Sequence, residues 1–171
     1  MKNIAFIGFM GTGKTTIATA LAHRLKMRYV STDEMIERKE KRTINEIFTK
    51  SGEEYFRDVE ADVVREASSM ENVVIDAGGG AVLREKNMEN LKSHGIVICL
   101  TAGEETIMRR TAKYKHRPLL NVDDPKRKIR DLLAERAPFY AKADHTIDTG
   151  KFTINQVVER VVEIVGRGDD S

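Results

Sequence analysis

Apolar residues along this chain gather into short runs that alternate with longer segments of helical spacing. The short runs predict five buried strands, at residues 3–8, 28–32, 72–76, 95–101 and 144–148. Strands that alternate with helical segments are typical of a parallel sheet covered by helices on both faces. The predicted fold class is therefore α/β, with three layers and a five-stranded parallel sheet.

The ends of several helices can be placed as well. Residues 16–25 keep apolar positions at helical spacing directly after the first strand. Residues 43–46 form a capping box that opens a short helix, and Gly52 predicts the end of that helix before a second one begins. Asp124 and Pro125 supply a cap and a first-turn proline for a later helix.

Composition fits a compact single domain over residues 1–171. Lys and Arg number 29 against 27 Asp and Glu, a net charge of +2 that gives no argument for binding nucleic acid. No apolar run is long enough to span a membrane, so we expect a cytoplasmic protein. We also expect a monomer, with a frayed tail at 166–171. The single cysteine, Cys99, lies in an apolar run and is expected to be buried rather than nucleophilic.

The segment from Gly8 to Thr15 fits the phosphate-binding pattern G-x-x-x-x-G-K-[ST] between a predicted strand and a predicted helix. Its glycines let backbone N–H groups close around phosphate oxygens, and the helix N-terminus adds partial positive charge. Lys14 is expected to reach the β- and γ-phosphates of a nucleotide, and the Thr15 hydroxyl to bind Mg²⁺. The expected nucleotide-binding residues here are Gly11, Thr12, Gly13, Lys14, Thr15 and Thr16.

Polar groups also follow the second and third predicted strands, where this architecture binds ligands. Asp33 can hold a substrate hydroxyl or accept its proton, or it can simply cap the next helix. The glycines Gly78, Gly79 and Gly80 either let a ligand approach bare backbone amides or form a tight turn. Asp76 ends an apolar run, as magnesium-associated aspartates do, although a bond to backbone or to Ser31 is the alternative.

Three arginines complete the candidate chemistry. Arg57 has Glu60 one helical turn further on, so a surface ion pair is one account of it. Arg117 lies in the polar, basic segment 112–122, which predicts a mobile loop, and Arg136 lies late in a predicted helix. Together these residues offer planar donors that suit a carboxylate or a transferring phosphoryl group.

These motifs make the chain resemble the shikimate kinase family from residue 1 to about residue 165. The matching segments are Gly8 to Thr16, Thr32-Asp33 with Ile36-Glu37, Gly52-Glu53 with Phe56-Arg57 and Glu60, Gly78 to Gly80, Arg117 to Leu120, and Arg136 with Tyr140. The resemblance implies a P-loop kinase fold like that of nucleoside monophosphate kinases, with strand order 2-3-1-4-5. It also implies a single kinase domain with a shikimate-binding subregion at 33–60 and a lid at 112–122.

The resemblance further implies phosphorylation of the 3-hydroxyl of shikimate by ATP with Mg²⁺, which gives shikimate 3-phosphate and ADP on the route to chorismate and the aromatic amino acids. Asp33 would then bind the hydroxyls near the reacting oxygen, and Arg57 and Arg136 would bind the carboxylate in a pocket lined by the three glycines. Arg117 would reach the phosphates from the lid, and Arg110 would pack against adenine. The implied catalytic residues are Lys14, Asp33 and Arg117.

One departure from the family concerns the metal. The family usually has an Asp-x-Asp pair after the second strand, whose first Asp contacts Mg²⁺ through water, whereas this chain reads Ser31-Thr32-Asp33. Conversely, Asp76 stands where the family often has Ser or Thr. We therefore predict that Asp76 takes over the metal role beside Thr15.

Two other functions remain open from the sequence. Another small-metabolite kinase, such as a gluconate kinase, shares the phosphate loop but need not carry paired arginines. A nucleotide-dependent switch or a silent binding module needs no second-substrate pocket, so the arginines and the three glycines count against it.

Overall fold

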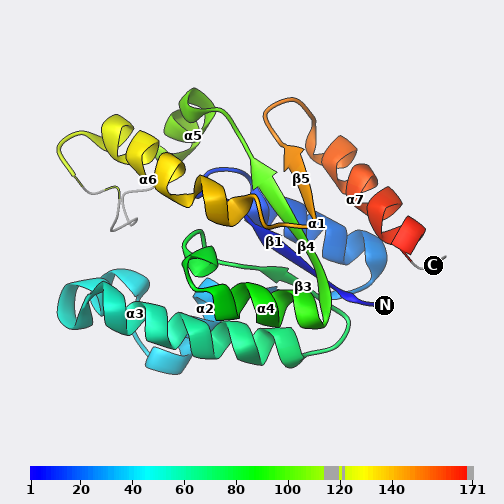
Figure 1. The fold of residues 1–171 in the computed structure, drawn as a ribbon, viewed down its shortest axis with the longest axis horizontal. Helices are drawn as coiled ribbons and strands as arrows, with labels where there is room; N and C mark the ends of the chain where they lie inside the picture. The colour runs from blue at the N-terminus through cyan, green and yellow to red at the C-terminus, as the bar shows by residue number, and fades with distance from the viewer. Residues whose placement is uncertain (114–119, 121, 169–171) are drawn as a thin grey trace.

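The computed structural model describes residues 1–113, 120 and 122–168. Its strands form one parallel sheet in the order β2-β3-β1-β4-β5 (Figure 1). They are β1 (Asn3–Ile7), β2 (Arg28–Ser31), β3 (Val73–Asp76), β4 (Gly95–Thr101) and β5 (His145–Asp148). Each predicted strand is confirmed to within one residue at either end, and the strand order implied by the resemblance is confirmed.

Helices cover both faces of the sheet, which confirms the predicted three layers. The helices are α1 (Lys14–Leu25), α2 (Thr32–Glu40), α3 (Ile44–Ser69), α4 (Glu85–Ser93), α5 (Glu104–Thr111), α6 (Pro125–Tyr140) and α7 (Ile154–Gly168), with a short 3₁₀ turn η1 (Ala81–Leu83). Within the described ranges, none of these helices is both long and apolar enough to cross a membrane.

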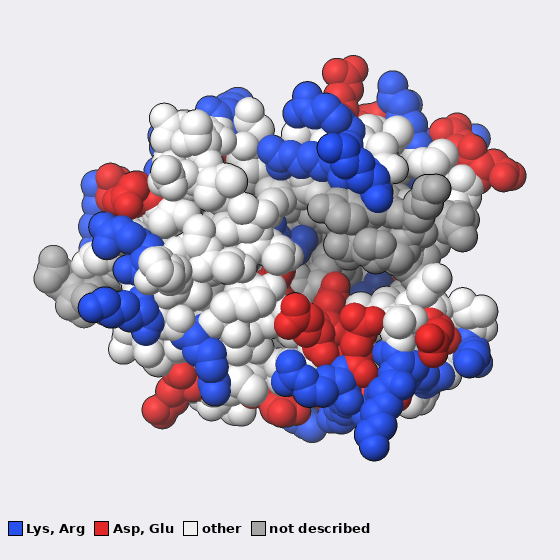
Figure 2. All heavy atoms as spheres, turned by 180° about the vertical axis from the view of Figure 1, so that it is seen from behind, with Lys and Arg blue, Asp and Glu red and all other residues white. Residues whose placement is uncertain are grey.

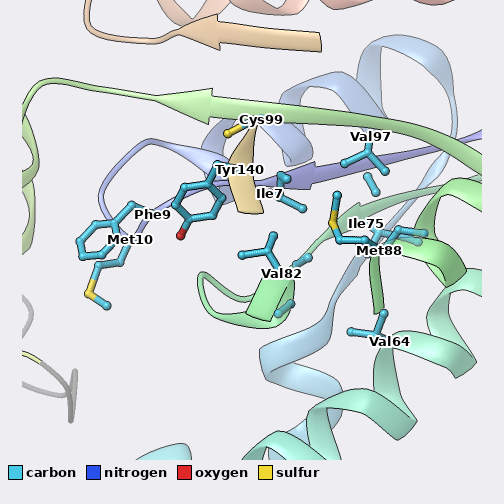
Figure 3. Close-up of a cluster of buried hydrophobic side chains, with 14 of the residues drawn as sticks. Ile7, Phe9, Met10, Val64, Ile75, Val82, Met88, Val97, Cys99 and Tyr140 are labelled. Carbon is cyan, nitrogen blue, oxygen red and sulfur yellow. The ribbon is translucent and has the colours of Figure 1, made fainter. Parts of the chain in front are cut away.

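The alternation of side chains along β1 divides the core into two parts. Ala5 and Ile7 face a cluster shared with α3, α4, α5 and α6, part of which Figure 3 shows around Ile7 and Val97. Ile4 and Phe6 face the opposite side, where α1 and α7 pack. Every residue of β1 is buried, and from Ile4 to Ile7 its sequence is apolar, as a central parallel strand requires. The polar Asn3 at its start is satisfied by hydrogen bonds to Met70 O and from Val73 N.

The segment after β2 forms a smaller unit at one end of the sheet. The Thr43 hydroxyl accepts a hydrogen bond from Glu46 N at 3.2 Å, so the predicted cap is confirmed. Gly52 interrupts α3 with φ 86° and ψ 169°, and α3 thus consists of the two predicted helical arms. Ile36, Ile47 and Phe56 form a separate apolar cluster that holds these arms against α2.

The carboxyl ends of the parallel strands share one edge of the sheet. The pairing of β3 with its two neighbours places Asp76 opposite Phe6 of β1 and opposite Ser31 of β2. Asp76 therefore lies between the loop that follows β1 and the start of α2. The Thr32 hydroxyl fastens this edge, because it accepts from Gly78 N at 3.0 Å.

Candidate functional site

A cavity of about 1110 Å³ opens at the carboxyl edge of the sheet. Figure 2 shows this face hollowed near its middle, with basic side chains gathered above the hollow and acidic side chains below it. At one end the cavity is lined by Gly11, Thr12, Gly13, Lys14, Thr15, Thr16, Arg109, Arg110, Lys113 and Thr149. At the other end it is lined by Asp33, Phe56, Arg57, Glu60, Gly78, Gly79, Gly80 and Arg136.

The first end is the loop between β1 and α1. Gly11 and Gly13 have φ angles of 79° and 94°, which side chains rarely adopt, so the glycine positions of the motif are needed by the backbone itself. Lys14 is buried, and its ammonium donates to Gly8 O at 2.8 Å and to Phe9 O at 3.1 Å. The loop is thus wrapped around its own lysine at the N-terminus of α1, an arrangement that favours a bound anion.

Two further side chains hold this loop in place. The Thr149 hydroxyl, just beyond β5, donates to Thr12 O at 2.6 Å. Arg110 of α5 donates to Gly11 O at 3.1 Å and lies along the cavity wall. The loop is therefore anchored to elements that lie more than ninety residues away in the sequence.

A hydroxyl and a carboxylate meet beside the loop. The Thr15 hydroxyl donates to Asp76 Oδ2 at 2.7 Å, and the Tyr29 hydroxyl donates to the same oxygen at 2.9 Å. The carboxylate of Asp76 thus bonds neither Ser31 nor backbone in the described structure, which removes the alternative left open by the sequence. Hard oxygen donors next to a phosphate-binding loop suit Mg²⁺, which is usually held by one or two carboxylates together with substrate phosphates.

Asp33 lies in the first turn of α2 and lines the cavity. The cap of this helix is Ser31, whose hydroxyl accepts from Glu34 N at 3.2 Å, so the alternative interpretation of Asp33 as the cap is wrong. Ser31 serves better because it still has the extended backbone that a cap residue needs, with ψ 123°. The Asp33 carboxylate therefore faces the cavity as a potential ligand for a hydroxyl.

Arg57 and Glu60 form the ion pair that their spacing predicted, with Nη1 and Oε1 2.8 Å apart. The pair is not on the surface, however, because Arg57 is 7% exposed and Glu60 is 1% exposed. Burial raises the pKa of Glu60, while the positive charge of Arg57 opposes the rise and the negative charge of Asp33 adds to it. The second Arg57 nitrogen, Nη2, lies 3.4 Å from Glu53.

Arg136 is the largest fully buried side chain of the described structure, at 1% exposed. Its guanidinium carbon lies 5.5 Å from the centre of the Phe9 ring, which contributes a cation–π interaction. Within the described ranges, its Nε and Nη1 have no hydrogen-bond acceptor, and neither does Arg57 Nε. A buried cation with unpaired donors is costly, so the arrangement favours an anionic ligand.

The three glycines lie against these charged groups. A Cβ on Gly78 would come within 2.9 Å of Asp33 Oδ1 and Glu60 Oε2, and a Cβ on Gly80 would collide with the Arg57 guanidinium. Gly79 O accepts from the Tyr140 hydroxyl at 2.7 Å, and burial raises the pKa of Tyr140 to about 12, which keeps the phenol protonated as a donor. Close approach of charged side chains, rather than turn geometry alone, therefore explains the run of glycines.

Arg117 lies outside the described residues, as does most of the segment 112–122. The role of this segment as a lid, and the role of Arg117 within it, therefore stay predictions.

Cys99 is free and buried, and burial raises the pKa of its thiol to about 11, so the expectation of an unreactive thiol is supported.

Sequence reasoning missed Tyr29 and Thr149. Tyr29 lies two residues before Ser31 on the same face of β2, so its strand position was a signal that it can reach the same edge as Asp76. Thr149 follows β5 directly, and position after a strand was the only available signal for it.

Comparisons with known proteins agree with this geometry. A family model described as shikimate kinase matches residues 10–165. The chain is 47% identical to the shikimate kinase of Thermoanaerobacter pseudethanolicus and 48% identical to that of Caldanaerobacter subterraneus, in each case over 95% of both chains. A solved structure of the shikimate kinase from Acinetobacter baumannii in complex with shikimate superimposes with a TM-score of 0.94 at 38% identity, covering 98% of this chain and 94% of that chain.

Proposed function

The chain belongs to the shikimate kinase family, and on that premise we propose that it transfers the γ-phosphoryl group of ATP to the 3-hydroxyl of shikimate. The products are shikimate 3-phosphate and ADP. The protein would act on small molecules as a cytoplasmic monomer with no nucleic-acid or membrane partner, and the net charge of +2 gives no argument for nucleic-acid binding.

The observation that carries the proposal is the pair of buried arginines at the far end of the cavity. Within the described ranges Arg136 has two donor nitrogens without an acceptor, and Arg57 keeps an unpaired Nε although it contacts Glu60. A ring carboxylate supplies the missing acceptors and neutralises a buried charge. Neither a nucleotide switch nor a kinase for an uncharged sugar requires two such groups.

The nucleotide end fits ATP with a divalent cation. Backbone N–H groups of the loop and the Lys14 ammonium would surround the β- and γ-phosphates, and Arg110, which lines the same end of the cavity, would pack against adenine. Thr15 and Asp76 would hold Mg²⁺, Asp76 in the role that an Asp at position 31 has elsewhere in the family. The cation supplies positive charge against the phosphoryl oxygens as negative charge redistributes during transfer.

The reaction relies on positioning and charge neutralisation. Phosphoryl transfer passes through a loose transition state whose charge is spread over the phosphoryl oxygens. Lys14, together with Arg117 from the segment 112–122, would stabilise this charge. Asp33 would orient the attacking hydroxyl and take its proton, and Arg57 and Arg136 would fix the ring that carries it.

A direct test measures ADP formation from ATP and Mg²⁺ with shikimate, gluconate or no acceptor. We expect shikimate alone to accelerate ADP formation, and phosphorus NMR to show one new phosphomonoester. Equal rates with and without shikimate would contradict the proposal, and acceleration by gluconate would favour the other metabolite kinase.

A further inference from the structure

Tyr29 contacts the candidate metal carboxylate from the neighbouring strand. Its hydroxyl donates to Asp76 Oδ2, the same oxygen that accepts from Thr15. We propose that Tyr29 is a positioning residue, which holds the Asp76 carboxylate against Thr15 in the geometry that binds the divalent cation. The inference rests on the proposed function, because the cation enters this site with the nucleotide.

Strand pairing explains how Tyr29 reaches Asp76. The register of β2 and β3 places Tyr29 opposite Val74 and Ser31 opposite Asp76. Residues two apart share a face of a strand, so Tyr29 and Asp76 lie diagonally on one face, within reach of an aromatic side chain. The Tyr29 ring packs on the apolar cluster beneath α1, which fixes one end of the side chain while its hydroxyl extends to the sheet edge.

The other β2 side chain on this face already has a different task. Ser31 lies directly opposite Asp76, but its hydroxyl accepts from Glu34 N and caps α2. Within the described structure, the side-chain hydrogen bond that links β2 to the Asp76 carboxylate therefore comes from Tyr29.

The position of the Asp76 carboxylate also determines how the Thr15 hydroxyl can bind a cation. A hydroxyl has a single hydrogen and two lone pairs, so a Thr15 that donates to Asp76 keeps both lone pairs for a cation. The orientation of the Thr15 hydroxyl thus depends on where the Asp76 carboxylate stands. The rigid phenol restricts that carboxylate, and groups that orient metal ligands in this way typically change metal affinity about 10- to 100-fold.

The test is Tyr29→Phe, which removes the hydroxyl and keeps the ring that packs beneath α1. Binding of Mn²⁺ to the complex of the protein with ADP is followed by electron paramagnetic resonance, without shikimate. We expect Tyr29→Phe to weaken Mn²⁺ binding about tenfold while ADP affinity measured without metal stays unchanged. Tyr55→Phe is the matched control, because it removes a phenol hydroxyl from the exposed part of α3 and should leave Mn²⁺ affinity as in the parent.

The same substitution in an Asp76→Ala protein distinguishes a positioning role of Tyr29 from a packing role. If Tyr29 acts through Asp76, Tyr29→Phe should cause no further loss of Mn²⁺ affinity in an Asp76→Ala protein. Parental Mn²⁺ affinity in Tyr29→Phe, or an equal loss in both backgrounds, would overturn the inference and leave the proposed function intact. A parent complex with ADP that binds no Mn²⁺ would overturn the proposed function together with this inference.

Discussion

The two ends of the cavity are built in opposite ways. The nucleotide end centres on one contiguous segment, residues 8–16, which binds mainly through backbone groups and a lysine that contacts its own loop. The acceptor end collects charged side chains from α2, α3 and α6, which are spread from Asp33 to Arg136. The first end takes its shape mainly from the local geometry of the loop, with Arg110 and Thr149 as long-range anchors, whereas the second depends entirely on long-range packing around buried charges.

The two ends of the cavity also differ in how well their buried cations are paired within the protein. Lys14 contacts two carbonyl oxygens of its own loop, so its donors have acceptors within the protein. Arg136 is buried with two donor nitrogens that lack an acceptor within the described ranges. The acceptor end therefore carries an electrostatic cost that a carboxylate ligand removes, and this cost makes it selective for an anionic acceptor.

The largest effects are expected at the acceptor end. Arg57→Ala or Arg136→Ala should weaken shikimate binding by about 2 to 5 kcal/mol, the usual cost when a buried charge loses its partner. Nucleotide binding should change little, because these arginines lie at the far end of the cavity. Calorimetric titration of each ligand provides the measurement, and parental shikimate affinity in both variants would remove the arginines from the site.

Two control variants test whether the loss of shikimate binding comes from the buried arginine charge. Arg130→Ala removes an exposed arginine of α6, the helix that also carries Arg136. Arg130 pairs with Glu104 at 3.0 Å, and its removal should leave shikimate affinity unchanged. Arg136→Met retains the packing volume without the charge. Without ligand, the free energy of unfolding of Arg136→Met should equal that of the parent or exceed it by about 1 kcal/mol. A loss of binding in this variant therefore cannot be attributed to a loss of folding.

At the nucleotide end, Lys14→Ala should lower turnover about 10²- to 10³-fold, as expected for removal of one electrostatic donor from the transferring phosphoryl group. Shikimate affinity should stay close to that of the parent, the reverse of the arginine variants. Steady-state kinetics with a shikimate titration measure both effects. Lys86→Ala, an exposed lysine of α4, is the control, and parental turnover in Lys14→Ala would refute the role of the lysine.

How much was predictable differs between the two ends. The strands, the phosphate loop and the Thr43 cap follow from local patterns, because short-range sterics and hydrogen bonding determine them. The burial of Arg136 was not predictable, since Phe9 and the glycine loop that cover it come from distant segments. Its position late in α6 fitted a surface residue, and a ligand was indicated only by its grouping with Arg57 and Arg117 and by the family resemblance.

The ion pair of Arg57 and Glu60 illustrates the same limit. Helical spacing predicted the contact correctly, but spacing carries no information on whether the contact is exposed. The Tyr29 hydrogen bond to Asp76 was also missed, because the register between two strands sets it and that register is not visible in either strand alone.

A moderate effect is expected at the boundary between the two ends, where the metal would lie. Asp76→Ala should raise the Mg²⁺ concentration needed for half-maximal rate about tenfold or more. Adding Ser31→Asp should recover much of the loss, because position 31 lies opposite position 76 in the sheet and aspartate also caps helices well. Rate against Mg²⁺ concentration is the measurement, and an unchanged dependence in a folded Asp76→Ala would contradict the metal role.

The smallest effects should distinguish Gly80 of the acceptor end from Gly52, which lies at the kink of α3. Gly80→Ala places a methyl group against the Arg57 guanidinium and should weaken shikimate binding by about 1 kcal/mol. Gly52→Ala instead meets open space but strains a backbone with φ 86°, so it should lower the free energy of unfolding by about 1 kcal/mol and leave binding unchanged. Calorimetry and thermal unfolding of both variants are the measurements, and equal shikimate binding in both would refute the close-approach account.

The central claim is that the acceptor end recognises a carboxylate through buried arginines, and calorimetric titration with shikimate and its methyl ester tests it most directly. The ester keeps the ring and its hydroxyls but removes the negative charge. We predict that the parent binds the ester about 30-fold more weakly than shikimate or worse, and that Arg136→Met loses most of this preference. Equal affinity of the parent for the acid and the ester would contradict the account.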